Sequence, residues 1–201
     1  MTATLFIVRH GNTFEAGDIV TRVGGRTDLR LSPSGEAQGL ALARHFAERG
    51  VVFVSARSGP LKRTRRTAEL ILEGQAAPLE LTTDLFLREI DYGPDENQPE
   101  DRVIARIGAA ALAAWERDSI PPPDWRIDPA AVIGNWQETF SELRSTIGAH
   151  LIVTSNGIAR FALPAASAVR AEVKLATGAY GVIELGARDE TVSGWNIRPG
   201  P

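Results

Sequence analysis

The sequence predicts an α/β fold: a three-layer sandwich in which helices cover both faces of a mostly parallel central sheet, with a hairpin at the C-terminus. Three observations predict it. Short apolar runs rich in β-branched or bulky residues alternate along the chain with longer helical patterns. Glycine and proline mark many of the connections between them. Strands and helices that alternate in this way form parallel sheets covered on both sides.

The strands are expected where continuous apolar runs end in a polar or glycine-bearing turn. Three such runs cover residues 4–8, 51–54 and 151–154, and each is typical of a strand buried on both faces. Near the end of the chain, residues 180–185 and 191–197 alternate apolar and polar side chains around a short loop. That alternation predicts the hairpin.

The first two helices are marked by their end signals. Ser32 and Pro33 open a helix that we expect to continue to residue 49, with serine as N-cap and proline in the first turn. Gly50 is its stop signal. A second helix is expected over residues 61–73, ended by Gly74.

Two further helices are expected between the second and third buried strands. An alanine-rich helix is predicted over 100–117 and another over 129–147. The prolines at 121–123 separate them, because proline is excluded from helix interiors. We interpret residues 94–148 as a helical excursion above the sheet within a single domain that spans 1–201.

Composition excludes several classes of protein. The chain has 201 residues, 43% apolar and 23% charged, which suits one globular domain. Its 22 Lys and Arg against 25 Asp and Glu argue against a nucleic-acid partner. With no cysteine, disulfides and thiolate chemistry are excluded. No apolar run is long enough for a membrane span and no secretory leader is visible, so we expect a cytoplasmic protein without a membrane partner. The oligomeric state is left open.

The first strand leads directly into the segment Arg9-His10-Gly11-Asn12-Thr13. Folds of this class bind ligands at the carboxyl ends of their strands. A neutral imidazole can attack phosphorus, while a neighbouring arginine lowers the pKa of the imidazole and binds phosphoryl oxygens. The alternative is a surface histidine at a strand end, because short motifs recur by chance. The segment alone leaves both interpretations open.

The second strand leads into a basic helix start, where Arg57 is followed by four basic residues between Lys62 and Arg66. One of them can be aimed at an anion from the first helical turn, where backbone N–H groups also favour negative charge. The others are expected on a solvated face, because the helical period cannot direct them all to one site.

Taken together, these segments resemble the histidine phosphatase superfamily, in the branch of cofactor-dependent phosphoglycerate mutases and small-molecule phosphatases. The resemblance runs in order along nearly the whole chain and implies the fold predicted above. Besides the segment around His10, the residues that carry it are Gly25 to Asp28, Leu31, Ser32, Gly35, Gln38, Ser58, Leu61, Arg63, Thr67, Ala68, Leu87 to Gly93, and residues 151–160.

The resemblance implies a role for particular side chains. His10 would be the nucleophile that forms a phosphohistidine, and Arg9 and Arg63 would hold the phosphate oxygens. Asn12 lies where family members often place a polar side chain toward the phosphate. Glu89 would protonate the leaving oxygen and later activate water. Without the resemblance, Glu89 is better explained as a solvated loop acid. No metal or organic cofactor is implied.

One position departs from the family pattern. The family has a second histidine followed by glycine after its last active-site strand, whereas this chain has Asn156 and Gly157. We expect both to bind phosphate, but an amide brings no positive charge. Losing a preorganised donor costs about a hundredfold or more in rate, so we expect reduced hydrolysis. His150 is predicted at the wrong end of its strand and His45 among apolar residues, so neither is expected to compensate.

Two other groups of residues have a structural and a functional interpretation. Several acidic residues lie in the segment 91–101, after Glu89. This segment is interpreted as a wall that selects a cationic substrate, as a weak divalent-metal site, or as a solvated loop that caps the next helix. We favour the solvated loop. Of the tryptophans, Trp115 and Trp195 are expected in the core. Trp125 is interpreted as an aromatic residue over the pocket entrance.

The sequence therefore predicts a metal-independent phosphomonoesterase that hydrolyses a small phosphorylated metabolite through a phosphohistidine on His10, with reduced activity. One alternative is a catalytically weak or inactive phosphate-binding member of the family. The other is a phosphoglycerate mutase, less favoured because the chain is short and the segment after Glu89 does not resemble that of the mutases. The identity of the phosphate ester is left open.

Overall fold

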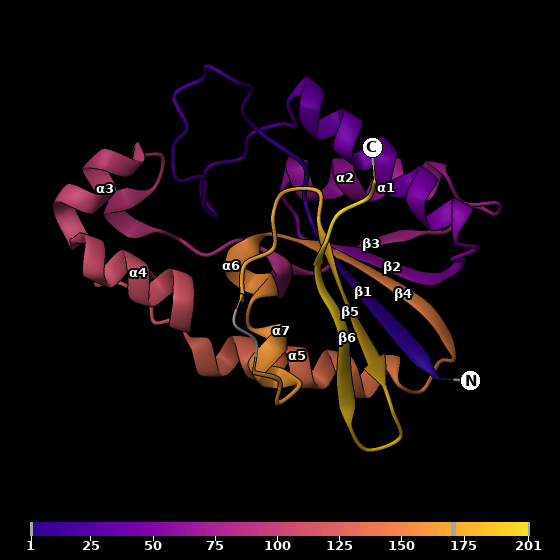
Figure 1. The fold of residues 1–201 in the computed structure, drawn as a ribbon. Coiled ribbons are helices and arrows are strands. Elements are labelled where there is room, and N and C mark those ends of the chain that lie inside the picture. Colours follow the sequence, from indigo (N-terminus) through magenta and orange to yellow (C-terminus); the bar gives the residue numbers. More distant parts are fainter. Residues whose placement is uncertain (1, 170–171, 201) are drawn as a thin grey trace.

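The central feature of the fold is a mixed sheet with helices on both faces (Figure 1). The computed structural model describes residues 2–169 and 172–200. Within them the sheet has six strands in the order β3-β2-β4-β1-β5-β6, of which the first four are parallel and the last two antiparallel. The strands are β1 (Ala3–Arg9), β2 (Phe53–Ser58), β3 (Leu81–Thr83), β4 (Gly148–Thr154), β5 (Tyr180–Leu185) and β6 (Glu190–Ile197). The predicted three-layer α/β sandwich with a C-terminal hairpin is confirmed.

Two helical layers sandwich the sheet. The helices are α1 (Pro33–Glu48), α2 (Lys62–Glu73), α3 (Glu100–Ile107), α4 (Ala109–Asp118), α5 (Pro129–Leu143), α6 (Asn156–Ala159) and α7 (Ala162–Ala165). Figure 1 shows α1 and α2 over one face and α5 with α7 under the other. Side chains of β1 alternate accordingly: Val8 packs with Leu42 of α1, whereas Leu5 and Ile7 belong to the core that contains Trp136 of α5.

Several element boundaries differ from the sequence prediction. The helix predicted over 100–117 is broken at Gly108, whose φ of 82° lies in the left-handed region that no α-helix can include. The last long helix ends at Leu143 instead of residue 147. Strand β2 starts at Phe53 and continues through polar residues to Ser58, beyond the apolar run 51–54. The short strand β3, with two exposed threonines, has no apolar run to announce it.

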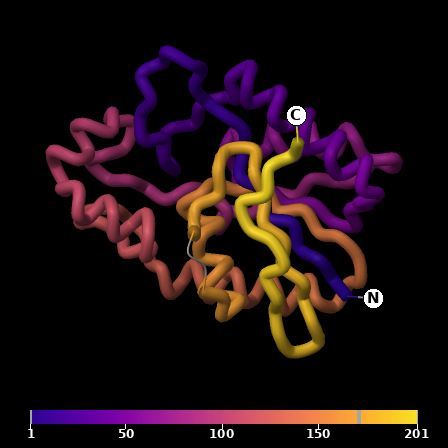
Figure 2. The backbone as a smooth tube through the Cα atoms, viewed as in Figure 1, coloured from indigo at the N-terminus to yellow at the C-terminus, as the bar shows by residue number. Residues whose placement is uncertain are grey.

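The helical excursion forms one wall of the molecule. Figures 1 and 2 show α3 and α4 beyond the edge of the sheet, beside the long connection between β1 and α1. The two segments are joined by a bridge between Thr21 and Pro99 and by backbone hydrogen bonds from Arg22 to Gln98 and from Asn97 to Arg22. In the described part of the chain, no helix is both long and apolar enough to span a membrane.

Candidate active site

A cavity of 480 Å³ opens where β1 and β4 end. It lies between the long connection after β1, the excursion helices and the connection before β5. Its lining includes five of the site residues predicted from the sequence: Arg9, His10, Asn12, Glu89 and Asn156. Most of the remaining wall comes from residues for which no site role was predicted. The lining residues are Arg9, His10, Asn12 to Ala16, Val20 to Val23, Glu89, Tyr92, Glu100, Trp115, Glu116, Asn156, Lys174 and Thr177.

His10 is held with one ring nitrogen ready for nucleophilic attack. Its Nδ1 lies 2.7 Å from the carbonyl oxygen of Gly11, which can only accept, so Nδ1 carries the proton. The opposite nitrogen, Nε2, accepts a hydrogen bond from Nε of Arg63 at 3.2 Å. Burial, followed by the charges of Arg63 and Arg9, holds the pKa of His10 well below its usual value. The imidazole is therefore neutral, with its lone pair on Nε2, and His10 is one of the residues that line the cavity.

Backbone contacts fix the turn that carries His10. A Cβ atom on Gly11 would collide with the carbonyl oxygen of Gly35, and one on Gly35 would collide with that of Asn12. The two glycines thus allow the turn and the start of α1 to cross at backbone contact. The amide of Gly11 also donates to Oγ1 of Thr67 in α2. The nucleophile is positioned by β1, α1 and α2 together.

Arg63 and Arg9 supply the positive charge at the inner end. Arg63 is fully buried in the first turn of α2 and also donates to the carbonyl oxygens of Thr27 (2.8 Å) and Gly24 (3.1 Å). Arg9 uses Nη1 to hold the carbonyl oxygen of Leu175 at 2.7 Å, while its buried Nε has no partner among the described residues. Burial lowers the pKa of both guanidinium groups. Arg9 lines the cavity and its positive charge is held by a carbonyl oxygen and by no carboxylate among the described residues, which suits an anionic ligand.

Glu89 is held against the turn that follows β4. Its side chain is buried, with 6% of the residue exposed, and accepts from the amides of Ile90 (2.9 Å) and Gly157 (3.2 Å). A Cβ atom on Gly157 would overlap Oε1 of Glu89. Gly157 is thus required as a glycine, and its N–H orients Glu89 instead of pointing at the cavity.

Asn12 braces the inner end rather than extending freely into it. Its Nδ2 donates to Oγ of Ser34 at 3.1 Å, and its Oδ1 accepts from the hydroxyl of Thr177 at 2.5 Å. Its backbone amide donates to Gln38. Asn12 lines the cavity as predicted, with one amide hydrogen left for a ligand.

This arrangement coincides with a family match. The model of the histidine phosphatase superfamily (branch 1) matches residues 5–198. The chain belongs to that superfamily. Figure 1 therefore shows the ribbon of a histidine phosphatase fold. The lining of the cavity places it at the carboxyl ends of the parallel strands.

Relatives within the superfamily include both mutases and phosphatases. A 2,3-bisphosphoglycerate-dependent phosphoglycerate mutase of Nitratidesulfovibrio vulgaris (strain DP4) is 33% identical over 125 residues, 60% of this chain and 48% of the mutase. One of Bartonella bacilliformis is 31% identical over 62% of this chain and 60% of the mutase. The chain thus spans about half to three fifths of the length of these curated relatives.

Solved structures share the fold over nearly their whole length. A mycobacterial glucosyl-3-phosphoglycerate phosphatase superposes with a TM-score of 0.80 at 20% identity, covering 97% of this chain and 99% of that protein. A phosphoglycerate mutase of Bacillus anthracis str. Sterne gives 0.82 at 19% identity, covering 97% and 93%. At this level of identity the likeness shows the fold alone.

The position of the superfamily's second histidine has two neighbouring candidates. Asn156, chosen because glycine follows it, lines the cavity, and its Oδ1 accepts from the amide of Leu175 at 2.9 Å. The strand register instead places Ser155 beside His10, since Arg9 pairs with Thr154 and the amide of His10 donates to the carbonyl oxygen of Thr154. Oγ of Ser155 is buried and has no hydrogen-bond partner in the described chain.

Three basic residues at the end of β2 and in α2, and the other two histidines, lie away from the cavity, but these basic residues form ion pairs where a solvated face was expected. Arg57, Lys62 and Arg66 form ion pairs with Glu142, Asp28 and Glu36 respectively, away from the cavity. His45 shares a 2.7 Å hydrogen bond with the hydroxyl of Tyr180, and His150 contacts Ser55 and the carbonyl oxygen of Thr146.

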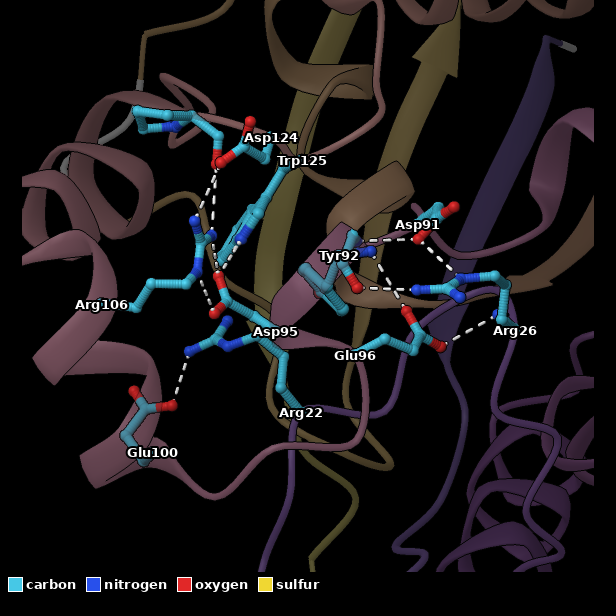
Figure 3. Close-up of polar contacts among 12 residues, drawn as sticks. Arg22, Arg26, Asp91, Tyr92, Asp95, Glu96, Glu100, Arg106, Asp124 and Trp125 are labelled. Atoms are coloured by element: carbon cyan, nitrogen blue, oxygen red, sulfur yellow. Dashed lines mark hydrogen bonds and ion pairs between the residues drawn. The ribbon is translucent and has the colours of Figure 1, made fainter.

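The acidic segment 91–101 differs from the solvated loop that we favoured. Figure 3 shows its carboxylates turned toward arginines and backbone amides. Asp95, only 2% exposed, accepts from Arg106 and from Nε1 of Trp125 at 2.7 Å. Asp91 and Glu96 both hold Arg26, through its side chain and its amide respectively. The acids fasten the excursion to the connection after β1. In the described residues, no three acidic or histidine side chains are grouped to hold a metal ion.

The prediction for Trp125 is wrong. It is buried against the rings of Tyr92 and Trp115, at centroid distances of 4.6 and 5.3 Å, and does not line the cavity. Trp115 is buried, as predicted, yet its ring edge also forms part of the cavity wall. The sequence analysis missed Arg22, Glu116 and Lys174, because nothing in their local sequence shows that they meet at one cavity.

Proposed function

We propose that this protein is a metal-independent phosphomonoesterase that hydrolyses a small phosphorylated metabolite through a phosphohistidine on His10. The observation that carries the proposal is the state of His10: neutral, protonated on Nδ1 at its contact with Gly11, and beside the guanidinium groups of buried Arg63 and half-buried Arg9. Arg9 and Arg63 can neutralise the phosphoryl oxygens, which is the task that a metal ion performs in other phosphatases.

The proposed reaction has two displacements at phosphorus. In the first, the lone pair on Nε2 of His10 attacks phosphorus, the ester P–O bond breaks, and the acid form of Glu89 protonates the leaving oxygen. Arg63 then redirects its Nε–H from Nε2 to a phosphoryl oxygen. In the second, water attacks phosphorus, the P–N bond breaks, and Glu89 takes the proton of the water. Inorganic phosphate leaves, and neutral His10 is regenerated.

Two observations bear on the rate and on the alternatives. Neither Ser155 nor Asn156 brings the positive charge of the superfamily's second histidine, which supports slow turnover and favours, as the second candidate, a phosphate-ligand-binding protein. A mutase must keep its phosphoenzyme away from water while substrates exchange. Relatives of that activity are matched over only about half to three fifths of their length, so we place the mutase reaction below hydrolysis.

The proposal is tested by release of phosphate from para-nitrophenyl phosphate, with a chelator and without added metal. Turnover that vanishes in His10→Ala supports it, and a phosphohistidine on His10 that is trapped by an alkaline quench and lost on acidification identifies the intermediate. A parent protein that binds phosphate yet releases none from a broad panel of esters would establish the binding function. Phosphoglycerate isomerisation that depends on a bisphosphate primer would establish the mutase.

A further inference from the structure

The outer half of the cavity differs in charge from its inner end. Beyond His10 the wall consists of an apolar side and a charged side. The apolar side chains come from the connection after β1 and from two aromatic rings. The charged side chains come from α3, α4 and the segment before β5, together with Arg22 of the connection after β1. The residues of this outer half are Phe14, Val20, Arg22, Val23, Tyr92, Glu100, Trp115, Glu116 and Lys174.

Both cations of the outer half are already paired. Nη2 of Arg22 lies 2.6 Å from Oε2 of Glu100, and the side chain of Arg22 is only 11% exposed. Its guanidinium also packs over the rings of Tyr92 and Trp125, at 5.3 and 5.0 Å from their centroids (Figure 3). Nζ of Lys174 lies 3.3 Å from Oε2 of Glu116. Among the described lining residues, the outer half therefore presents no unpaired cation.

Glu116 is held in its place from behind. Arg160 is fully buried, lies 4.1 Å from the ring centroid of Trp115, and donates to the carbonyl oxygen of Trp115. Its Nη2 is also 3.8 Å from Oε2 of Glu116. The end of α4 is thus fixed by a buried cation, and the carboxylate of Glu116 is directed between Arg160 and Lys174. A carboxylate fixed in this way keeps Lys174 occupied, so a second anionic group on a ligand has to displace it, and it accepts hydrogen bonds from hydroxyls.

We infer that the substrate is a phosphate monoester of an uncharged, hydroxyl-bearing alcohol, and that Glu116 excludes esters with a second anionic group. The inference rests on the proposed function. The phosphate binds at the inner end, where the charge of Arg9 has no carboxylate partner among the described residues. Carbon atoms of the leaving group pack on Phe14 and Val20, and its hydroxyls donate to the carboxylates of Glu116 and Glu100. A leaving group with its own carboxylate finds each outer cation occupied.

The test compares glycerol 3-phosphate with 3-phosphoglycerate, which share a three-carbon backbone and differ in one carboxylate. We expect kcat/KM of the parent protein to be at least about tenfold higher for glycerol 3-phosphate, as for one unfavourable charge contact. Glu116→Gln keeps the shape but frees Lys174, so kcat/KM for 3-phosphoglycerate rises and the ratio falls toward one. Glu142→Gln removes the ion pair between Arg57 and Glu142, which lies outside the cavity, and leaves the ratio unchanged.

A parent that prefers 3-phosphoglycerate, or a ratio that Glu116→Gln does not move, overturns the inference. Failure of the proposed function appears separately, as a parent that does not release phosphate even from para-nitrophenyl phosphate. In that case calorimetric titration of the parent with the same two esters decides. The inference is supported if the parent binds glycerol 3-phosphate more tightly than 3-phosphoglycerate and if this difference in affinity is smaller in Glu116→Gln. Tighter binding of 3-phosphoglycerate by the parent refutes it.

Discussion

The inner and outer halves of the cavity are built from the same kinds of residues but in opposite ways. At the inner end, buried guanidinium groups are held by backbone carbonyl oxygens, and Arg9 keeps a donor without a partner in the described chain. In the outer half, Arg22 and Lys174 are neutralised by Glu100 and Glu116. The inner end of the cavity is thus suited to bind one anion, whereas the outer half of the same cavity disfavours a second.

The difference separates reactivity from selectivity. Carbonyl oxygens carry only partial charge, so the arginines they hold keep their attraction for a phosphoryl group. Carboxylates cancel the charge of the cations they hold, leaving a surface that suits neutral groups. Substitutions in one half should therefore change the rate constant for chemistry, and those in the other should change the choice of leaving group.

The largest expected effect is a loss of kcat when Gly157, at the inner end of the cavity, is replaced by alanine. Gly157→Ala places a methyl group where Oε1 of Glu89 lies, so the carboxyl must move away from the leaving oxygen. We expect kcat to fall by about a hundredfold or more, as when a general acid is misplaced. Gly134→Ala is the matched control, because a Cβ there meets nothing within 4 Å and kcat should not change. A Gly157→Ala protein with parental kcat would remove Glu89 from the reaction.

A second experiment adds a positive charge to the inner end of the cavity by introducing a histidine beside His10. The register places residue 155 beside His10, and Asn156 already holds the amide of Leu175. Ser155→His is therefore expected to raise kcat/KM by about tenfold, since charge-assisted hydrogen bonds are stronger than neutral ones. Asn156→His should bring a smaller gain because it loses the contact with Leu175. The opposite ranking would assign the superfamily's histidine position to residue 156; thermal melts of both variants check that they fold.

A smaller effect is expected from the scaffold of the outer half. Arg106→Met leaves the buried carboxylate of Asp95 with Trp125 as its remaining side-chain partner. We expect the free energy of unfolding to fall by about 2 kcal/mol, toward the lower part of the range for breaking a buried pair, because Arg106 is partly exposed. KM should rise a few-fold with kcat unchanged. Arg117→Met, which breaks an exposed pair with Asp118, should alter neither quantity measurably.

The smallest expected effect is a shift in the titration midpoint of His10, which should differ from that of a solvated histidine. Burial and the charges of Arg63 and Arg9 lower the pKa of His10, so its imidazole stays neutral as pH falls through the usual histidine range. Proton NMR of the three histidines, assigned with His10→Ala, should show the midpoint of His10 well below 6.5. Arg9→Met removes a positive charge and should move that midpoint upward. A midpoint at the ordinary value would remove the basis for a neutral nucleophile.

The two halves also differ in how far sequence could predict them. Arg9, His10 and Arg63 follow strand ends or open a helix, so local pattern and family resemblance together place them at one edge of the sheet. Glu116 and Lys174 meet only because α4 and the segment before β5 pack around Arg160. No short-range signal encodes such a contact. The wrong expectation for Trp125 has the same origin, since its partner Asp95 is 30 residues away.

The prediction of one helix over residues 100–117 was wrong because a single glycine interrupts a segment whose composition favours a helix. The alanine-rich segment 100–117 has high helical propensity throughout, yet Gly108 breaks it and turns α4 away from α3. That break positions Trp115 and Glu116 at the cavity. The acids of segment 91–101 look solvated in the sequence because charged side chains usually are. Their arginine partners, Arg26 and Arg106, lie outside that segment, one on each side of it.

The crossing of Gly11 and Gly35 has a consequence for the motions of the molecule. Because the Gly11 amide is bonded to buried Thr67, and the backbone beside it contacts the start of α1, the turn cannot open without separating two core helices from the sheet. Amide hydrogen exchange at Gly11 should therefore proceed only through global unfolding, whereas the exposed residues 16–20 of the same connection should exchange through local fluctuation. The turn that carries His10 is therefore expected to be as rigid as the core, although His10 lines the cavity.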